Sequence, residues 1–507
     1  MNGFPRQTSI LAVLLALGLH VPAAGAARRP AITHHPPEIS VLVDSIHAHN
    51  ALRLGPGIDA YNYHVAYGFR HAFDYLRLQG VQVTEVTSGR LDEKLLEGHQ
   101  MVFMNLVSAD LPPFLVSEIF AIKHYIRSGG SLLVIIDHSN CYLHAYKLMP
   151  LLDELGIEVK TEIACERAPY TLGQGNGWIA ISRFTPHPVT RGLRTIAFET
   201  GGTVDDRYAV AWTSSRSWGD QWRVHPYAEG DTMGFYGNWK QDPGERSGPL
   251  GVVLAKQLGR GRIVILGDQN MMGDPFINYA DNYRLWLNSV SWLTGDSRLA
   301  NVDPYLNWRP RIRFYDQYVH SAFGNSDSDG FYNIFAAVGR RMWAFAGDDL
   351  TSQQVIVFAD TNCTLSGDDL AAVIRHLRAR RAIVVLGPAI TADAPLPALL
   401  SQIGAKLGKP VVDSDPTKQT CRWPGYGRLI ILKGHEVYQN GFVPPPETAP
   451  DEHQQVLLNT VISTLENAMK DAVPALLKGR VANAHPAPLP GAHPIWRAKT
   501  GTQSPVS

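Results

Sequence analysis

The stretch that most constrains the fold is GGSLLVIIDHSNCYL, residues 129–143. Two glycines precede five consecutive apolar residues, 132–136, which lack the alternation of a half-exposed strand. An unbroken apolar run of this length predicts a strand buried on both faces, as in a parallel sheet covered by helices. Asp137 and His138 then follow the carboxyl end of this strand, where an open α/β sheet keeps its binding crevice.

Similar apolar runs alternate with helical patterns along the first half of the chain. The predicted strands are 39–43, 81–86, 101–106 and 263–266, and the predicted helices are 63–79, 112–127, 146–155 and 282–293. This alternation predicts a doubly wound parallel sheet. Right-handed crossovers would place Asp44, Asn105 and Asp137 along one edge of that sheet.

The N-terminus has the features of a secretory signal peptide. Arg6 precedes an apolar run at 10–19, and small residues occupy 24–26. We expect cleavage after Ala26, with an uncleaved anchor as the alternative. No later stretch has the length of a membrane span. We therefore expect a periplasmic or secreted protein with no membrane span after signal cleavage.

The charge balance limits the class of partner. Lysine plus arginine and aspartate plus glutamate both number 46, and no long basic run occurs. This balance argues against nucleic acid or an anionic membrane surface as a partner. A small molecule, a glycan or another protein remains possible.

The four cysteines permit three complete pairings. In an exported protein the simplest arrangement joins Cys141 to Cys165 and Cys363 to Cys421, because each bridge then stays within one domain. Four buried thiols are the alternative interpretation.

Residues 170–250 differ in composition from the sequence around them. They are rich in glycine, threonine and serine, and they hold five of the eleven tryptophans. We expect short additional strands and a lid-like excursion here. Trp178 and Trp218 are candidates for stacking on a ligand, although packing of extra strands is the more frequent role of tryptophan.

The second half of the chain repeats the first in outline. Strand-like runs at 355–358, 383–386 and 427–432 and helical patterns at 368–378 and 454–465 follow the order of the first half. Gly387 and Pro388 replace Asp137 and His138, and Gly434 replaces Asp268. We therefore predict a first domain at 38–298 that holds any site, a degenerate second domain at 310–470, and a disordered tail at 471–507.

Three motifs resemble the class I glutamine amidotransferase-like superfamily. They are Asp44-x-x-His47, the 129–138 stretch ending in Asp137-His138, and GRIVILGD-x-N ending in Asp268 and Asn270. More narrowly, the chain resembles the branch called DUF4350, which is related to domains of gliding-motility and intraflagellar-transport proteins. The resemblance covers 38–296 well and 312–466 weakly. It implies two tandem flavodoxin-like, class I glutamine amidotransferase-like α/β domains with doubly wound parallel sheets.

The resemblance also indicates where this chain departs from the enzymes. The amidotransferases carry a nucleophilic cysteine on the elbow after the organising strand and a histidine after a later strand. Here Asp137 stands at the elbow, Cys141 comes four residues later, and Asp268 and Asn270 replace the late histidine. We therefore do not expect glutamine hydrolysis by the family mechanism.

The strand ends combine carboxylates and imidazoles, the groups that hold a divalent metal or act as general acid and base. The catalytic candidates are Asp137, His138 and Asp268, and the ligand-binding candidates are Asp44, His47, His49, Asn105, Asn270, Trp178 and Trp218. Helix capping by the aspartates is the structural alternative. Two hypotheses follow: a non-catalytic binding or scaffold module, which we favour, and a hydrolase-like enzyme that acts on a small molecule or glycan, with a divalent metal as its candidate cofactor.

Overall fold

The computed structural model describes 39–49, 68–172, 176–221, 237–302, 312–315, 329–341, 344–348, 350, 353–391, 394–433 and 448–472. The described residues, which begin at Ile39, belong to one compact unit. The predicted signal peptide and the tail from 473 onward lie outside the described residues. Among the described helices, none combines the length and the apolar character needed to cross a membrane.

The first half of the chain forms an eight-stranded sheet in the order β2-β1-β3-β4-β12-β11-β9-β7. The strands are β1 (Ser40–Asp44), β2 (Gln82–Val86), β3 (Met101–Asn105), β4 (Ser131–Ile135), β12 (Gly261–Leu266), β11 (Gly251–Leu258), β9 (Ala209–Trp212) and β7 (Arg183–Phe184). The first five strands are mutually parallel, and the pairs β12-β11, β11-β9 and β9-β7 are antiparallel. This parallel order is flavodoxin-like. The predicted doubly wound sheet and its shared edge at Asp44, Asn105 and Asp137 are confirmed.

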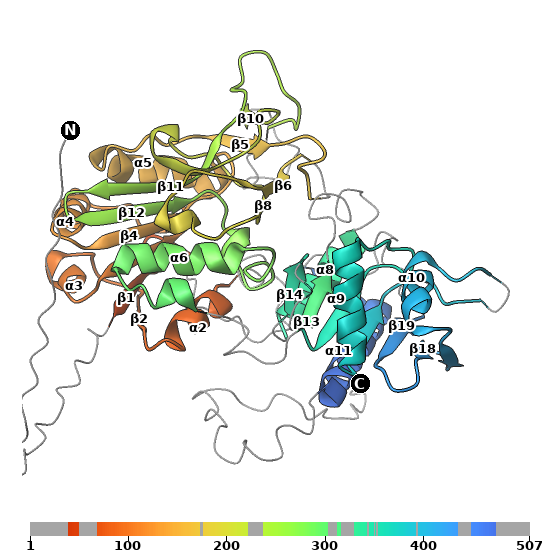
Figure 1. Ribbon diagram of the computed structural model, residues 1–507. Coiled ribbons are helices and arrows are strands. Elements are labelled where there is room, and N and C mark those ends of the chain that lie inside the picture. Colours follow the sequence, from red (N-terminus) through yellow and green to blue (C-terminus); the bar gives the residue numbers. More distant parts are fainter. Residues whose placement is uncertain are drawn as a thin grey trace, which may run out of the picture. The chain divides into compact units, whose positions relative to one another are not determined.

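Helices cover both faces of this sheet (Figure 1). One face carries α2 (Arg70–Arg77) and α6 (Asn282–Thr294), and the other carries α3 (Glu93–Glu97), α4 (Val116–Arg127) and α5 (His144–Glu154). Strand β4 is apolar throughout because Leu133 and Ile135 pack toward the first face while Leu132 and Val134 pack toward the second. Helix α6 ends at Gly295, whose φ of 77° suits glycine.

The tryptophan-rich segment contributes strands, as predicted. Besides β9 and β7, it holds β6 (Trp178–Ile181), which pairs with β8 (Ile196–Glu199). It also holds β10 (Trp218–Gln221), which pairs with β5 (Glu162–Cys165), a strand that precedes the segment. Short 3-10 turns in this half are η1 (Cys141–Leu143), η2 (Pro188–Thr190), η3 (Asp206–Tyr208), η4 (Asn270–Met272) and η5 (Leu299–Asn301).

The second half forms a seven-stranded sheet in the order β14-β13-β15-β16-β19-β18-β17. Its strands are β13 (Ile312–Tyr315), β14 (Ala344–Gly347), β15 (Val355–Phe358), β16 (Ala382–Val385), β17 (Val411–Ser414), β18 (Lys418–Arg422) and β19 (Arg428–Leu432). Its helices are α8 (Asp329–Gly339), α9 (Gly367–Arg378), α10 (Ala398–Leu407) and α11 (Glu452–Ala472). The first six strands repeat the order and directions of the first sheet, so the predicted repeat of two α/β domains is confirmed.

Candidate functional site

The turn after β1 holds a buried imidazole between two carboxylates. His47 Nδ1 lies 3.0 Å from Asp44 Oδ2, and His47 Nε2 lies 3.4 Å from Glu118 Oε2. Burial opposes the charged imidazole, but the hydrogen bond and charge of Asp44 and the charge of Glu118 outweigh it and raise the pKa of His47. Phe114 stacks on the ring at a centroid distance of 4.3 Å. Both nitrogens of His47 are therefore committed to internal partners.

Glu118 was not singled out from the sequence. It accepts hydrogen bonds from the backbone N–H groups of Leu115 and Leu91, as the third residue of α4 in a capping arrangement. A glutamate three residues after the start of a helical pattern is the sequence signal that indicates such a cap.

The turn after β4 brings together three different donor groups. Asp137, His138 and Cys141 each place one ligand atom within 4.8 Å of the others, and all three side chains are buried. Burial and the neighbouring Asp137 carboxylate raise the pKa of the Cys141 thiol. Ser139, with φ of 49°, and Tyr142, with φ of 53°, adopt left-handed backbone conformations that non-glycine residues disfavour.

Asp268, after β12, is saturated by backbone donors. Its carboxylate accepts hydrogen bonds from the N–H groups of Glu199, Asn270 and Met271 at 2.5, 2.7 and 3.4 Å. Burial raises the pKa of Asp268 to about 7, against the lowering effect of these three donors. The side chain is fully buried. The Asp268 carboxylate therefore has a structural role: its hydrogen bonds to Asn270 and Met271 stabilise the η4 turn, and its hydrogen bond to Glu199 joins this turn to the end of β8.

A glycine pair crosses the sheet edge above these turns. Gly202 donates from its N–H to the carbonyl of Gly267 at 2.7 Å, and Gly201 accepts from Ala164 N–H at 3.0 Å. A Cβ on Gly202 would lie 2.5 Å from the carbonyl oxygen of Asp137, and one on Gly201 would lie 2.6 Å from Cβ of Asp268. Only glycine permits this close approach, which helps to enclose Asp137 and Asp268.

The remaining candidates are His49, Asn105, Trp178 and Trp218, of which His49 and Asn105 lie close to the turn after β4. His49 meets Tyr142 edge to face, and its N–H donates to the carbonyl of Asn105 at 2.9 Å. Asn105 is buried, and its Oδ1 lacks a hydrogen-bond partner among the described residues. Trp178 packs against Phe276, whereas Trp218 is only 2% exposed with the Arg167 guanidinium over its ring. The described packing therefore gives Trp218 no open face for stacking on a ligand.

The four cysteines carry free thiols in the structure. No disulfide joins Cys141, Cys165, Cys363 or Cys421, all of which lie in the described part of the chain. Three of the cysteines pack among apolar neighbours: Cys165 beside Ile163 and Trp218, and Cys363 and Cys421 in the core around α9 and α10. Cys141 lies instead beside the polar side chains of Asp137, His138 and His144. The alternative of thiols within the protein interior is the one that the structure supports, with Cys363 only partly buried.

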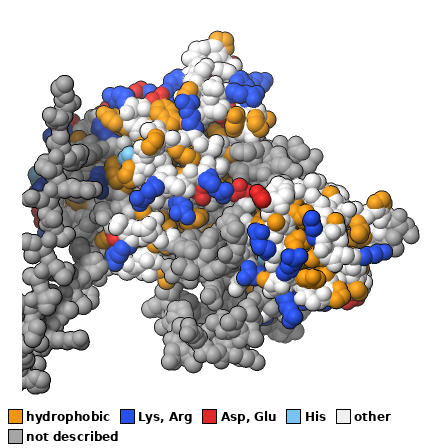
Figure 2. Space-filling model, in the orientation of Figure 1, with side chains coloured by type: hydrophobic (Ala, Val, Ile, Leu, Met, Phe, Trp, Pro, Cys, Tyr) orange, Lys and Arg blue, Asp and Glu red, His pale blue; other side chains and the backbone are white. Residues whose placement is uncertain are grey.

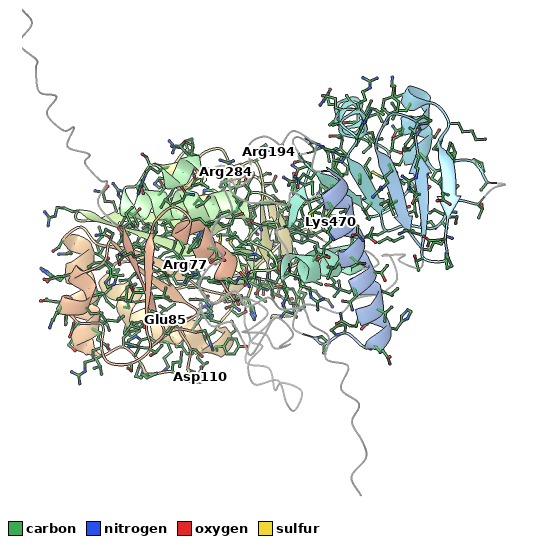
Figure 3. All side chains as sticks on the ribbon, turned by 90° about the horizontal axis from the view of Figure 1, so that it is seen from below. Arg77, Glu85, Asp110, Arg194, Arg284 and Lys470 are labelled. Atoms are coloured by element: carbon green, nitrogen blue, oxygen red, sulfur yellow. The ribbon has the colours of Figure 1, made fainter. Side chains whose placement is uncertain are left out.

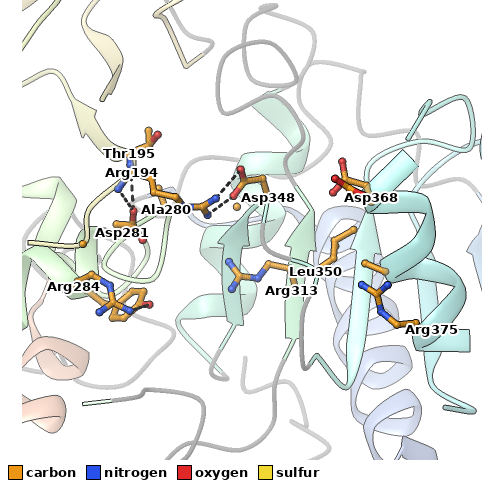
Figure 4. A pocket seen from close by; sticks show the side chains of 15 residues that line it. Arg194, Thr195, Ala280, Asp281, Arg284, Arg313, Asp348, Leu350, Asp368 and Arg375 are labelled. Carbon is orange, nitrogen blue, oxygen red and sulfur yellow. Dashed lines mark hydrogen bonds and ion pairs between the residues drawn. The ribbon is translucent and has the colours of Figure 1, made fainter. Parts of the chain in front are cut away.

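A separate charged pocket of about 490 Å³ lies beside α6 and α9 (Figure 4). A parallel bridge between Tyr279 and Ala346 brings its walls together. Arg194 and Arg284 come from the first half of the chain and lie near each other in Figure 3 and Figure 4, while Arg313 and Arg375 come from the second half.

Most carboxylates of the charged pocket are already engaged. Asp348 pairs with Arg194 at 2.7 Å, and Asp281 accepts from the N–H groups of Arg194 and Thr195. Asp369 accepts from Ser366 Oγ at 2.6 Å. Among the described residues, no carboxylate pairs with Arg284 or Arg375. Four arginines and four aspartates line the pocket, so its formal charge is balanced, and two of the arginines, Arg284 and Arg375, lie outside the ion pairs of the described residues.

The sheet order and the buried strand ends define the class of protein as one with tandem doubly wound α/β domains. No family model and no curated protein matches the chain. Among solved structures, it is similar to the mmIFT52 N-terminal domain, at 16% identity and a TM-score of 0.36, over 50% of this chain and 97% of that one. It is also similar to a ThuA-like protein from Bacteroides uniformis, at 16% identity and a TM-score of 0.29, over 55% and 96%. TM-scores this low carry no argument about function.

Proposed function

We propose that the chain is a glutamine amidotransferase-like binding module without amidotransferase activity. The observation that carries this proposal is the state of the strand-end groups: Asp44, His47 and Asp268 are at most 1% exposed and bond internally. A nucleophilic thiol needs thiolate character and exposure. Cys141 is 1% exposed, and burial together with Asp137 raises its pKa.

The ligand that we propose is a small anionic molecule bound in the charged pocket. Arg284 is half-buried and Arg375 is exposed, and both line the pocket without a carboxylate partner among the described residues. Arg313, only 4% exposed, lies against Phe345 and near Gly347. Guanidinium groups bind carboxylates and phosphates through paired N–H donors. The periplasmic or secreted location is part of this proposal.

The test is thermal unfolding of the purified protein with increasing concentrations of phosphate, citrate and a sugar phosphate. Ligand that binds only the folded state at 100 times its Kd stabilises by about 2.7 kcal/mol. We expect a rise in Tm that Arg284→Gln and Arg375→Gln abolish. Arg378→Gln is the matched control, because Arg378 is exposed on the same helix but does not line the pocket.

Two outcomes would overturn the proposal. An equal rise in Tm in Arg375→Gln, Arg284→Gln and the unaltered protein would place the binding elsewhere, and no rise with any anion would remove the anion site. Turnover of nitrophenyl esters, phosphates or glycosides that disappears in a folded Asp137→Asn variant would support the hydrolase-like alternative instead.

A further inference from the structure

The turn after β4 combines a carboxylate, an imidazole and a thiol, three groups that bind transition metals. Their ligand atoms all lie within 4.8 Å of one another. Asp137, His138 and Cys141 are 2%, 7% and 1% exposed. The grouping is local, since all three residues belong to the turn between β4 and α5.

We propose that Asp137, His138 and Cys141 form a zinc site of mixed oxygen, nitrogen and sulfur ligands. Tetrahedral zinc with bonds of about 2.0–2.3 Å separates its ligand atoms by roughly 3.3–3.8 Å. Since the ligand atoms lie within 4.8 Å of one another, a contraction of at most about 1.5 Å brings them to the separations of a zinc site. The thiolate favours zinc over magnesium or calcium, which prefer oxygen ligands throughout.

Buried polar atoms next to the three proposed ligands give a second, independent indication of a bound ion. His144 Nδ1 lies 2.9 Å from the carbonyl oxygen of Cys141, so Nδ1 carries the proton in this contact. His144 Nε2, Ser139 Oγ and Asn140 Nδ2 are buried and lack hydrogen-bond partners among the described residues. Buried polar atoms without partners in a native structure point to an ion or water that completes the network. His144 also positions Cys141, with Nδ1 3.8 Å from its Sγ.

The test is the metal content of the full chain, expressed with added zinc and purified without chelator. We expect about one zinc per chain by elemental analysis, and at least about a tenfold loss in Cys141→Ser and His138→Gln. Cys421→Ser is the matched control, since Cys421 is also fully buried but lies on β18. It should keep the zinc. Circular dichroism confirms that each variant is folded.

Cobalt replacement separates loss of the site from loss of the fold. Cobalt bound to the unaltered protein should give a thiolate-to-metal charge-transfer band, which Cys141→Ser removes and Cys421→Ser retains. Absence of metal from the unaltered protein would overturn the proposal, as would zinc and charge transfer that persist in Cys141→Ser. Neither result bears on anion binding at Arg284 and Arg375, so this inference and the proposed function fail independently.

Discussion

His47 Nε2 lies 3.4 Å from Glu118 Oε2, and both side chains are almost completely buried. The contact ties the turn after β1 to the first turn of α4, because Glu118 also accepts from the backbone N–H groups of Leu115 and Leu91. Asp44 holds the other nitrogen of the ring. A residue predicted to bind a ligand therefore contacts two carboxylates of the protein itself.

Replacing His47 with glutamine should lower the free energy of unfolding by about 3–5 kcal/mol, because two buried carboxylates lose the cation between them. The pKa of His47 is raised above its usual 6.5, so its stabilisation is full below about pH 6.5 and is lost as pH rises through the folded-state value. Urea unfolding at several pH values measures both effects. His124→Gln, at an exposed position on α4, is the control and should change stability by less than about 0.5 kcal/mol.

The contribution of Asp268 to the free energy of unfolding should fall as pH rises from about 4 to about 7. Its folded-state pKa is about 7, while an unfolded aspartate titrates near 3.9, so the folded state binds the extra proton in this interval. The loss amounts to about 4 kcal/mol at most. Urea unfolding of Asp268→Asn should show a flatter pH dependence, whereas the exposed Asp153→Asn should keep the original one. An unchanged pH dependence in Asp268→Asn would contradict this prediction.

Gly202→Ala should destabilise the protein by about 1–3 kcal/mol, because the added Cβ would lie 2.5 Å from the backbone oxygen of Asp137. Gly404→Ala on α10 is the matched control, since no atom lies within 4 Å of its Cβ position. That change should be neutral or stabilise by up to about 1 kcal/mol. Thermal unfolding measures the change in Tm of both variants. Equal changes would contradict the prediction, because they would mean that the backbone at Gly202 shifts to admit a Cβ without loss of stability.

Surface charge gives a further comparison between sequence and structure. On the face drawn in Figure 2, basic and acidic side chains are interspersed with apolar and uncharged ones. Basic side chains are more prominent than acidic ones on this face, so the equal totals of the sequence do not describe it. Totals do not reveal which charges pair: Arg194 pairs with Asp348, far along the chain, and that contact forms only when the two halves pack.

Several strands escaped prediction because their sequences lack a strong local signal. Strand β17 is exposed along its whole length, and β14 consists of only four residues, two of them alanine. In strand β11, Lys256 and Gln257 interrupt the apolar pattern shortly before the strand ends at Leu258. Pairing with neighbouring strands, rather than their own composition, makes these segments β-structure.

The sequence by itself determined the β-α-β order, the buried strand β4 and the repeat, because apolar runs and helical spacing are local properties of the chain. It also placed Asp44, Asn105 and Asp137 at one sheet edge. Only the tertiary structure decided which partners the strand-end side chains contact. The Glu118 carboxylate lies beside His47, and the backbone N–H of Glu199 donates to the Asp268 carboxylate. These partners are distant in the sequence, and burial makes each of them satisfy the other's charge or hydrogen bond.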